Sequence, residues 1–247
     1  MSKEKEWFEN EDFWLNYGPI MFDEQQWAQA HGIAEKCIEL AQLEEGASCL
    51  DVCCGPGRIS VELALLGMKV TGVDITQPFL DAALETAEDE EVKITLINQD
   101  MRKFKSSKKF DMALNVYNSF GYCDSISDDT KILKQVYASL KKGGTFILES
   151  AVKYFTEGEW FERAGMTVLT DFSVVGAWEG LRSKWILIDE KKSTRIEHCF
   201  VQRLYSAAEL RDSLLKEVGF KTAEVYGGFN MEPYDQNAST MVIVCRK

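Results

Sequence analysis

Residues 49–58 have the sequence CLDVCCGPGR, which joins a short apolar run to a turn with two glycines. The apolar run predicts a buried strand over residues 48–52, and the pattern after the turn predicts a helix over 59–66. Gly55 and Gly57 let the backbone turn tightly and approach a ligand closely. Because ligands bind beyond the carboxyl ends of parallel strands, and free N–H groups at a helix start attract anions, this loop is a candidate ligand site.

Short apolar runs alternate with helical patterns on both sides of this loop. Strands are predicted at residues 69–74, 94–98, 110–116 and 145–149, and helices within 4–43 and at 78–87 and 129–140. Runs that are apolar throughout are typical of a parallel sheet that helices cover on both faces. Since the connections between parallel strands are right-handed, the sequence predicts a doubly wound α/β fold.

The pattern changes after residue 150. Antiparallel strands are predicted at 166–175, 181–189 and 194–204, then a helix that opens with a capping box at 206–209, then strands at 221–226 and 240–245. We interpret the antiparallel segment as an insertion on a single core. The expected organisation is an N-terminal helical lid at 1–44, a cofactor-binding core at 45–150, an antiparallel insertion that caps the substrate at 151–204, and the C-terminal part of the core at 205–247.

An acidic residue ends the second predicted strand, which finishes with TGVD at residues 71–74. An acid about 20 residues past the glycines is placed to accept hydrogen bonds from ribose hydroxyls. This geometry fits either a dinucleotide or S-adenosylmethionine. The dinucleotide fingerprint G-x-G-x-x-G needs a third glycine, and Ser60 stands at that place. The spacing therefore disfavours an oxidoreductase that uses a dinucleotide.

The chain resembles the class I S-adenosylmethionine-dependent methyltransferases of the small-molecule type. Their first motif is an acid followed by G-x-G-x-G, and Asp51 and residues 53–57 stand in those places, with Cys53 replacing the first glycine. The resemblance covers residues 45–150 and extends to the segments RLYSAAEL and VGF at 203–210 and 218–220. It implies a Rossmann-like, seven-stranded, mostly parallel sheet with strand order 3-2-1-4-5-7-6 and an antiparallel last strand. It also implies S-adenosyl-L-methionine as cofactor and S-adenosyl-L-homocysteine as product.

The family's pattern assigns individual residues to the cofactor. Asp74 matches the acid that binds the ribose, and Asp100 matches the acid that reads the adenine amino group. Asn115 and the backbone of the next two residues are placed to contact the methionine part. The full set expected around the cofactor is Asp51, Cys53, Cys54, Gly55, Gly57, Arg58, Asp74, Ile75, Phe79, Asp100, Met101, Arg102, Asn115, Val116 and Tyr117.

The fourth strand leads into NVYN at residues 115–118, the strand end that faces the reacting methyl group in this fold. Methyltransferases that act on nucleobase or glutamine amides often carry Asn/Asp-Pro-Pro-aromatic here, so the missing prolines argue against those substrates. We therefore expect a small-molecule acceptor with a nitrogen, oxygen or carbon nucleophile. Tyr117, Asn118 and Tyr122 are candidates to line its pocket, although Phe120 and Tyr122 suit packing under a loop equally well.

The N-terminal region is rich in aromatic side chains, namely Trp7, Phe8, Phe13, Trp14, Tyr17, Phe22 and Trp27. Such a segment is either a lid that excludes water from the site or an amphipathic helix whose aromatics form a core. We expect Trp14 and Tyr17 to face the substrate. His198 and Glu149 are the candidates for a general base, since an amine acceptor must be neutral to react, but a lone histidine in a strand is more often structural.

Charge and cysteine content narrow the surroundings of the protein. Forty acidic residues against 28 basic ones give a net charge of -12, which disfavours nucleic acid and anionic membranes as partners. The seven cysteines, mostly isolated, and an N-terminus without an apolar signal indicate a cytoplasmic location. With two histidines, no metal site is expected. A homodimer fits the sequence without being selected by it, and the alternative outside the enzymes is a non-catalytic module that binds the cofactor.

Overall fold

The structure, a computed structural model, describes residues 6–151, 158–238 and 240–247. The chain divides into two compact units. The larger consists of Glu24–Phe120, Ser125–Val152 and Ser206–Lys247, and the smaller of Met1–Asp23, Gly121–Asp124 and Lys153–Tyr205. The larger unit contains a seven-stranded sheet and the smaller a four-stranded one.

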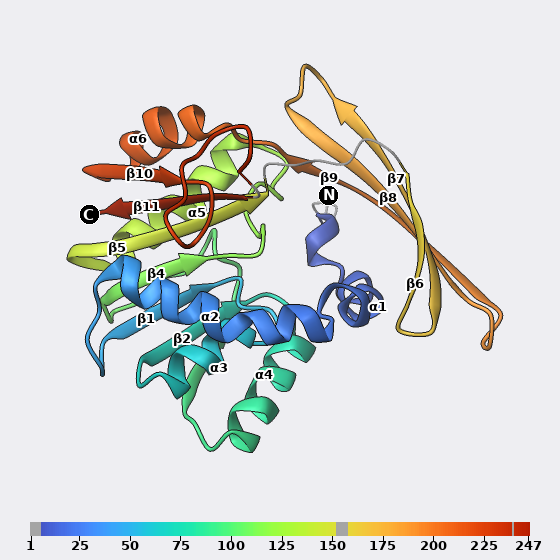
Figure 1. Ribbon diagram of the computed structural model, residues 1–247, viewed down its shortest axis with the longest axis horizontal. Coiled ribbons are helices and arrows are strands. Elements are labelled where there is room, and N and C mark those ends of the chain that lie inside the picture. The colour runs from blue at the N-terminus through green and yellow to red at the C-terminus, as the bar shows by residue number, and fades with distance from the viewer. Residues whose placement is uncertain (1–5, 152–157, 239) are drawn as a thin grey trace, which may run out of the picture. The chain divides into compact units, whose positions relative to one another are not determined.

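The sheet of the larger unit has the strand order β10-β11-β5-β4-β1-β2-β3 (Figure 1). Its strands are β1 (Ser48–Val52), β2 (Lys69–Asp74), β3 (Ile94–Asn98), β4 (Phe110–Asn115), β5 (Leu140–Ala151), β10 (Thr222–Tyr226) and β11 (Thr240–Arg246). Strand β11 pairs antiparallel with both β5 and β10, and the other pairs are parallel. The predicted strand order and the antiparallel last strand are therefore confirmed.

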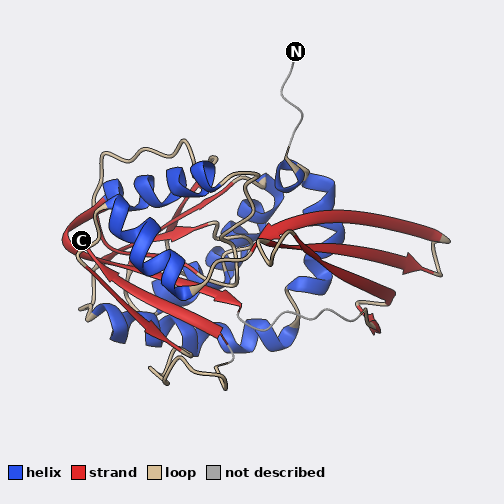
Figure 2. Cartoon of the chain, turned by 90° about the horizontal axis from the view of Figure 1, so that it is seen from above, coloured by secondary structure: helices blue, strands red, loops and turns tan. Residues whose placement is uncertain are grey.

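Helices lie on both sides of this sheet (Figures 1 and 2). They are α2 (Glu24–Ala41), α3 (Arg58–Leu65), α4 (Gln77–Asp89), α5 (Ile126–Ser139), the π-helical segment η2 (Glu209–Leu215) and α6 (Lys216–Val218). The main core cluster joins α2 and α3 to the sheet through buried side chains such as Ala34, Leu63 and Leu114. Burial of these apolar faces on a parallel sheet is the main stabilising contribution that the doubly wound arrangement offers.

Two elements of the larger unit, α5 and β5, begin several residues earlier than predicted. Helix α5 begins at Ile126 because the side chain of Ser125 accepts a hydrogen bond from the Asp128 N–H and caps the helix. Strand β5 begins at Leu140, whereas the sequence predicted its start at residue 145. The reason is pairing with the last residue of the chain, since the Lys247 N–H donates to the Gly144 carbonyl at 3.0 Å.

The smaller unit is an antiparallel sheet packed on short N-terminal helices. Its strands β6 (Trp160–Arg163), β7 (Met166–Val175), β8 (Gly180–Asp189) and β9 (Thr194–Arg203) follow one another in sheet order. Strands β7 to β9 agree with the prediction, whereas β6 was not predicted. The helices are η1 (Trp7–Glu9) and α1 (Glu11–Met21). Phe13, Tyr17 and Ile20 of α1 form one buried cluster with Val168 and Leu187 of the sheet.

The segment expected to be a lid, residues 1–44, is divided between the two units at Asp23. Helix α1 belongs to the smaller unit, together with the insertion. Helix α2 belongs to the larger unit because Ala30, Ala34 and Cys37, each 0% exposed, face the main core. Within residues 6–151, 158–238 and 240–247, no helix combines the length and apolar character that a bilayer crossing needs.

Candidate functional site

The loop between β1 and α3 is held in a conformation that few residues tolerate. Cys53, Gly55 and Gly57 have φ values of +59°, +54° and +79°. A Cβ atom on Gly57 would lie 2.5 Å from the Ala83 Cβ of α4, so only glycine lets the two helices approach this closely. Cys53, where the family has glycine, adopts the left-handed conformation despite its side chain, at a cost of about 1–2 kcal/mol.

Asp74, the last residue of β2, braces this loop. Its carboxylate accepts hydrogen bonds from the N–H groups of Gly55 and Thr76, each at 2.8 Å. Burial raises the pKa of Asp74, and these two N–H groups act in the opposite direction. Each carboxylate oxygen can accept a second hydrogen bond. The predicted contact with ribose hydroxyls is therefore compatible with the hydrogen bonds to Gly55 and Thr76.

Asp51 lies on β1, below the loop, and is 3% exposed. Its carboxylate accepts a hydrogen bond from the Ser60 Oγ at 2.7 Å, which ties the strand to the first turn of α3. Burial raises the pKa of Asp51 to about 6, against the effect of the Ser60 hydrogen bond. The sequence singled out Asp51 as a site residue but not Ser60. The available signal was the position of Ser60 in the first turn of the helix that follows the glycine loop.

Asp100 follows β3 and is paired with Arg102. The Arg102 Nη2 lies 2.8 Å from the Asp100 Oδ2, and the Arg102 N–H donates to Oδ1 at 2.8 Å. Burial raises the pKa of Asp100, but the hydrogen bonds and charge of Arg102 outweigh it and hold this pKa below its usual value. The carboxylate is therefore ionised and fixed in orientation, as an acceptor for an amino group requires. Its contact with adenine stays a prediction.

Asn115 ends β4 and presents an unused acceptor. Its Nδ2 donates to the Val52 carbonyl at 2.8 Å, whereas its buried Oδ1 has no partner among the described residues. Buried polar atoms are normally hydrogen-bonded, so an orphaned acceptor next to the glycine loop suits a donor on a ligand. The ammonium group of S-adenosylmethionine is such a donor, and the residues at this strand edge therefore fit the cofactor.

Tyr117 and Arg58 connect the end of β4 to the start of α3. The Arg58 Cζ lies 4.0 Å from the centre of the Tyr117 ring, and Arg58 Nη1 donates to the Gln26 Oε1 of α2 at 3.1 Å. Among the other predicted cofactor residues, Phe79 and Met101 are buried, and Ile75 directly follows Asp74. Gln26 was not predicted, because nothing in its local sequence distinguishes it from a surface glutamine.

The predicted substrate residues fall in both units. Asn118 and Glu149 lie in the larger unit and are hydrogen-bonded to each other. In the smaller unit, Trp14, Tyr17, Tyr122 and His198 share one aromatic cluster with Trp7, Phe13 and Phe200. The structure thus brings together four predicted residues from three distant segments of the sequence.

Four polar atoms in this aromatic cluster are buried without a partner among the described residues. They are the Trp7 Nε1, the Tyr17 hydroxyl, the Trp185 Nε1 and the His198 Nε2. The Tyr17 ring centre lies 5.2 Å from that of Trp185 and 5.4 Å from that of His198. Burial lowers the pKa of His198 and raises that of Tyr17, so both side chains are neutral near pH 7. Trp185 was not predicted, although it pairs with His198 across β8 and β9.

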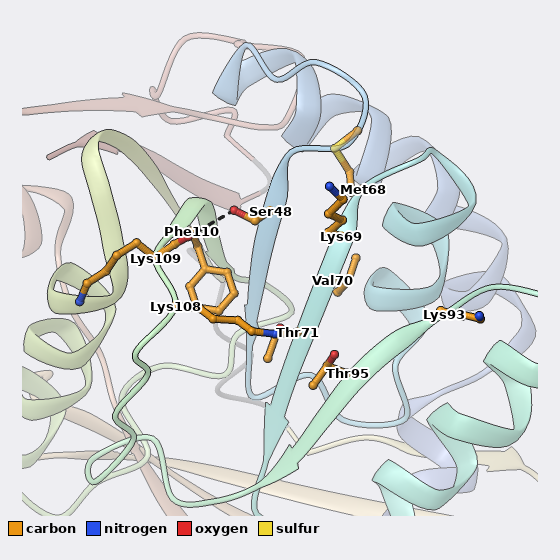
Figure 3. A pocket seen from close by; sticks show the side chains of 10 residues that line it. All are labelled: Ser48, Met68, Lys69, Val70, Thr71, Lys93, Thr95, Lys108, Lys109 and Phe110. Carbon is orange, nitrogen blue, oxygen red and sulfur yellow. Dashed lines mark hydrogen bonds between the residues drawn. The ribbon is translucent and has the colours of Figure 1, made fainter.

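A pocket of about 610 Å³ lies at the other end of the large sheet (Figure 3). Its lining residues are Ser48, Met68, Lys69, Val70, Thr71, Lys93, Thr95, Lys108, Lys109 and Phe110. Ser48, Lys69 and Phe110 are the first residues of β1, β2 and β4. None of the predicted site residues lines this pocket, so it is separate from the site at the carboxyl ends of the strands.

Comparisons with known proteins bear on the choice of cofactor. Residues 49–144 match the family model described as a methyltransferase domain. A protein of Geobacillus sp. (strain WCH70) that is named as a methyltransferase is 25% identical over 209 residues, which cover 80% of this chain and 83% of that protein.

Solved structures agree at the level of the fold. An S-adenosylmethionine-dependent methyltransferase from Clostridium acetobutylicum ATCC 824 superposes with a TM-score of 0.77 at 19% identity, covering 95% of this chain and 97% of that one. CalS10, an amino pentose methyltransferase from Micromonospora echinaspora, was solved with S-adenosylmethionine bound and has a TM-score of 0.70 at 17% identity, with coverage of 96% and 97%.

These matches decide between the two cofactors in favour of S-adenosylmethionine. The matched residues run from Cys49 on β1 to Gly144 on β5 and so include the glycine loop and both acids. The fold, the loop and the relatives agree that the protein is an enzyme that transfers methyl groups. Over residues 49–144 the chain is similar to the methyltransferase domain family, in agreement with its resemblance to the class I S-adenosylmethionine-dependent methyltransferases.

Proposed function

We propose that this enzyme methylates a nitrogen, oxygen or carbon nucleophile of a small molecule that the aromatic cluster of the smaller unit helps to bind. The observation that carries the proposal is the set of unpartnered buried atoms on Tyr17, Trp185 and His198. An unsatisfied buried polar group costs about 1–3 kcal/mol, so a ligand that supplies hydrogen bonds there gains affinity. The aromatic rings around these atoms offer the apolar surface that small-molecule sites usually have.

The class of acceptor is narrowed by charge and by one relative. The net charge of -12 disfavours nucleic acid, and the end of β4 lacks the prolines of enzymes that act on nucleobase or glutamine amides. CalS10 is described as acting on an amino pentose, a polar ring with a nucleophilic nitrogen. A molecule of that kind would use both the aromatic faces and the unpartnered polar atoms.

The larger unit supplies the methyl donor. S-adenosylmethionine contributes an electrophilic methyl carbon that its sulfonium activates, so the protein mainly aligns and desolvates the partners. Gly55 and Gly57 allow close approach, Asp74 and Asp100 hold the nucleoside, and Asn115 accepts the ammonium group. Each of these roles uses a group that the structure orients before the ligand arrives.

His198 is the proposed general base. Since burial lowers its pKa, the imidazole is neutral near pH 7 and can accept a proton. Its Nε2 has no hydrogen bond among the described residues that would compete for this role. In the smaller unit it faces the rings of Phe13 and Tyr17, which limit access by water.

The test is consumption of S-adenosylmethionine over a panel of amino sugars, small amines, phenols and acidic metabolites, with S-adenosylhomocysteine as the measured product. We expect turnover with at least one class. For that acceptor, His198→Asn should lower kcat and leave the affinity for S-adenosylhomocysteine unchanged. Methylation of proteins or nucleic acid alone would overturn the proposal, and an unchanged kcat would remove the role of His198.

A further inference from the structure

Two adjacent residues after β4 adopt a backbone conformation that side chains disfavour. Tyr117 and Asn118 have φ values of +60° and +61°, although neither is glycine. Such residues persist only where their surroundings hold them, and they occur most often at functional sites. The turn therefore needs a partner that stabilises it.

Glu149, near the end of β5, is that partner. Its Oε2 accepts a hydrogen bond from the Asn118 N–H at 3.2 Å, and its carboxylate also accepts one from the Tyr117 N–H. Its Oε1 accepts a hydrogen bond from the Thr240 Oγ1 of β11. In addition, the Ser150 Oγ donates to the Asn118 Oδ1 at 3.1 Å. One carboxylate thus ties two successive backbone N–H groups to the neighbouring strands.

The charge of Glu149 is balanced by hydrogen bonds and not by a cation. No lysine or arginine of the described residues lies within ion-pair distance of it. A carboxylate in such surroundings depends on each of its donors, because a buried charge without partners is costly. The turn and the carboxylate therefore stabilise each other.

The turn is also connected to the cofactor loop. The Tyr117 ring lies against the guanidinium of Arg58, which is the first residue of α3 and directly follows Gly57. Arg58 continues the contact to Gln26 of α2. A change at Glu149 thus reaches the cofactor loop through Tyr117 and Arg58, without a direct contact.

We propose that Glu149 is a positioning residue, which holds the Tyr117–Asn118 turn and thereby the side of the cofactor site formed by Tyr117 and Arg58. This role differs from that of the general base for which Glu149 was a candidate in the sequence. Both carboxylate oxygens are directed at groups of the protein, and a base needs an oxygen directed at the substrate.

Isothermal titration with S-adenosylhomocysteine tests the proposal on the full-length protein. Glu149→Gln keeps the shape of the side chain but replaces one acceptor oxygen with a donor. We expect it to weaken binding about tenfold, as loss of a hydrogen bond to a charged group implies. Thr240→Val removes one donor and leaves the carboxylate, so a smaller loss is expected. Glu88→Gln, an exposed site on α4, is the matched control and should bind like the wild type.

Amide resonances provide a second measurement that does not depend on ligand binding. In ¹H–¹⁵N spectra, Glu149→Gln should shift the Tyr117 and Asn118 amides strongly and leave the Gly55 amide, which Asp74 holds, in place. Wild-type affinity together with unshifted amides would overturn the proposal. So would a variant that loses only kcat, because that result is expected of a general base. If Glu149→Gln does not fold, unshifted amides in Thr240→Val would also overturn it.

Discussion

Cys53 is the residue of the cofactor loop with the greatest backbone strain for its type. Its φ of +59° costs about 1–2 kcal/mol, whereas glycine there loses the partly buried thiol and about 0.5–1 kcal/mol of chain entropy. These terms nearly cancel, so Cys53→Gly should change the free energy of unfolding by less than about 1 kcal/mol. Cys53→Val should cost about 2 kcal/mol or more, since β-branched residues avoid this region. Urea unfolding measures both, and equal stabilities would contradict the backbone argument.

Asp51 should make stability depend on pH in a defined window. Its folded pKa of about 6 lies above the usual 3.8, so the folded state holds the proton more tightly. Its contribution is complete below about pH 4 and is lost as the pH rises through 6, by about 3 kcal/mol in total. The unfolding free energy of the wild type relative to Asp51→Asn should therefore fall between pH 4 and 7.

The matched control for this pH dependence is Asp111→Asn. Partial burial raises the pKa of the Asp111 carboxylate. Hydrogen bonds from Lys141 and Ser48 lower this pKa by more than burial raises it, so it lies below its usual value. Its contribution is thus lost only at more acidic pH. The difference in unfolding free energy between wild type and Asp111→Asn should stay constant between pH 4 and 7. A fall parallel to the one measured with Asp51→Asn would show that Asp51 is not the cause.

Asp74 is the acid proposed to bind the ribose of the cofactor. Asp74→Ala should weaken binding of S-adenosylhomocysteine by about 1.5–3 kcal/mol, since a hydrogen bond to a charged group is lost. The same substitution also frees the N–H groups of Gly55 and Thr76. Titration calorimetry should be accompanied by a melting curve, with the exposed Asp81→Ala as the control. Unchanged affinity in a folded Asp74→Ala protein would refute the ribose role.

At the scale of elements, the packing of α3 on α4 depends on one glycine. In Gly57→Ala, the new Cβ meets the Ala83 Cβ at 2.5 Å and the residue must also keep its φ of +79°. Strain and overpacking together should cost about 3 kcal/mol. Gly46 has a similar φ of +83° and nothing within 4 Å of its ideal Cβ, so Gly46→Ala should cost only about 1 kcal/mol.

A double substitution separates the two contributions at Gly57. Adding Ala83→Gly removes the atom that the new Cβ meets, but not the backbone strain. The double variant should therefore lose less unfolding free energy than the two single variants lose together. Thermal or urea unfolding measures these losses. Strict additivity would mean that α3 and α4 move apart without cost.

Elements that are apolar on both faces were readily found in the sequence. Strands β1, β2 and β3 were predicted with the bounds that the structure has, because each is a short, mostly apolar run between turn residues. Strand β6 was missed because its residues are mostly exposed and give no apolar pattern. The start of β5 was misplaced because local glycines indicate a turn, whereas the pairing with Lys247 is not local.

The same distinction holds for the site. The glycine loop and its acids were predictable, since their spacing along the chain reflects the geometry of one strand–helix unit. Gln26 and Thr240 were not, because each meets its partner only through the packing of separate elements. The contact of Glu149 with the Tyr117–Asn118 turn belongs to this second class.

At the scale of the whole molecule, the smaller unit is not a simple insertion. It is assembled from three separate parts of the chain, Met1–Asp23, Gly121–Asp124 and Lys153–Tyr205. Neither the charge nor the hydrophobic periodicity of the sequence indicates that α1 shares a core with strands that follow more than a hundred residues later. Aromatic side chains are the signal that was present, since Trp7, Phe13 and Tyr17 all reappear in the contacts of β8 and β9.

The composition of that cluster has a consequence for how the protein is made. Phe13 leaves the ribosome early, yet the ring that it meets on Phe200 is synthesised 187 residues later (200 minus 13). At about 5–20 residues per second, α1 waits on the order of ten seconds or more for its partners. During that time its aromatic face has no native surface to cover it. Helix α1 therefore reaches its final packing only after β9 has been translated, and nascent chains should expose an apolar segment that chaperones recognise.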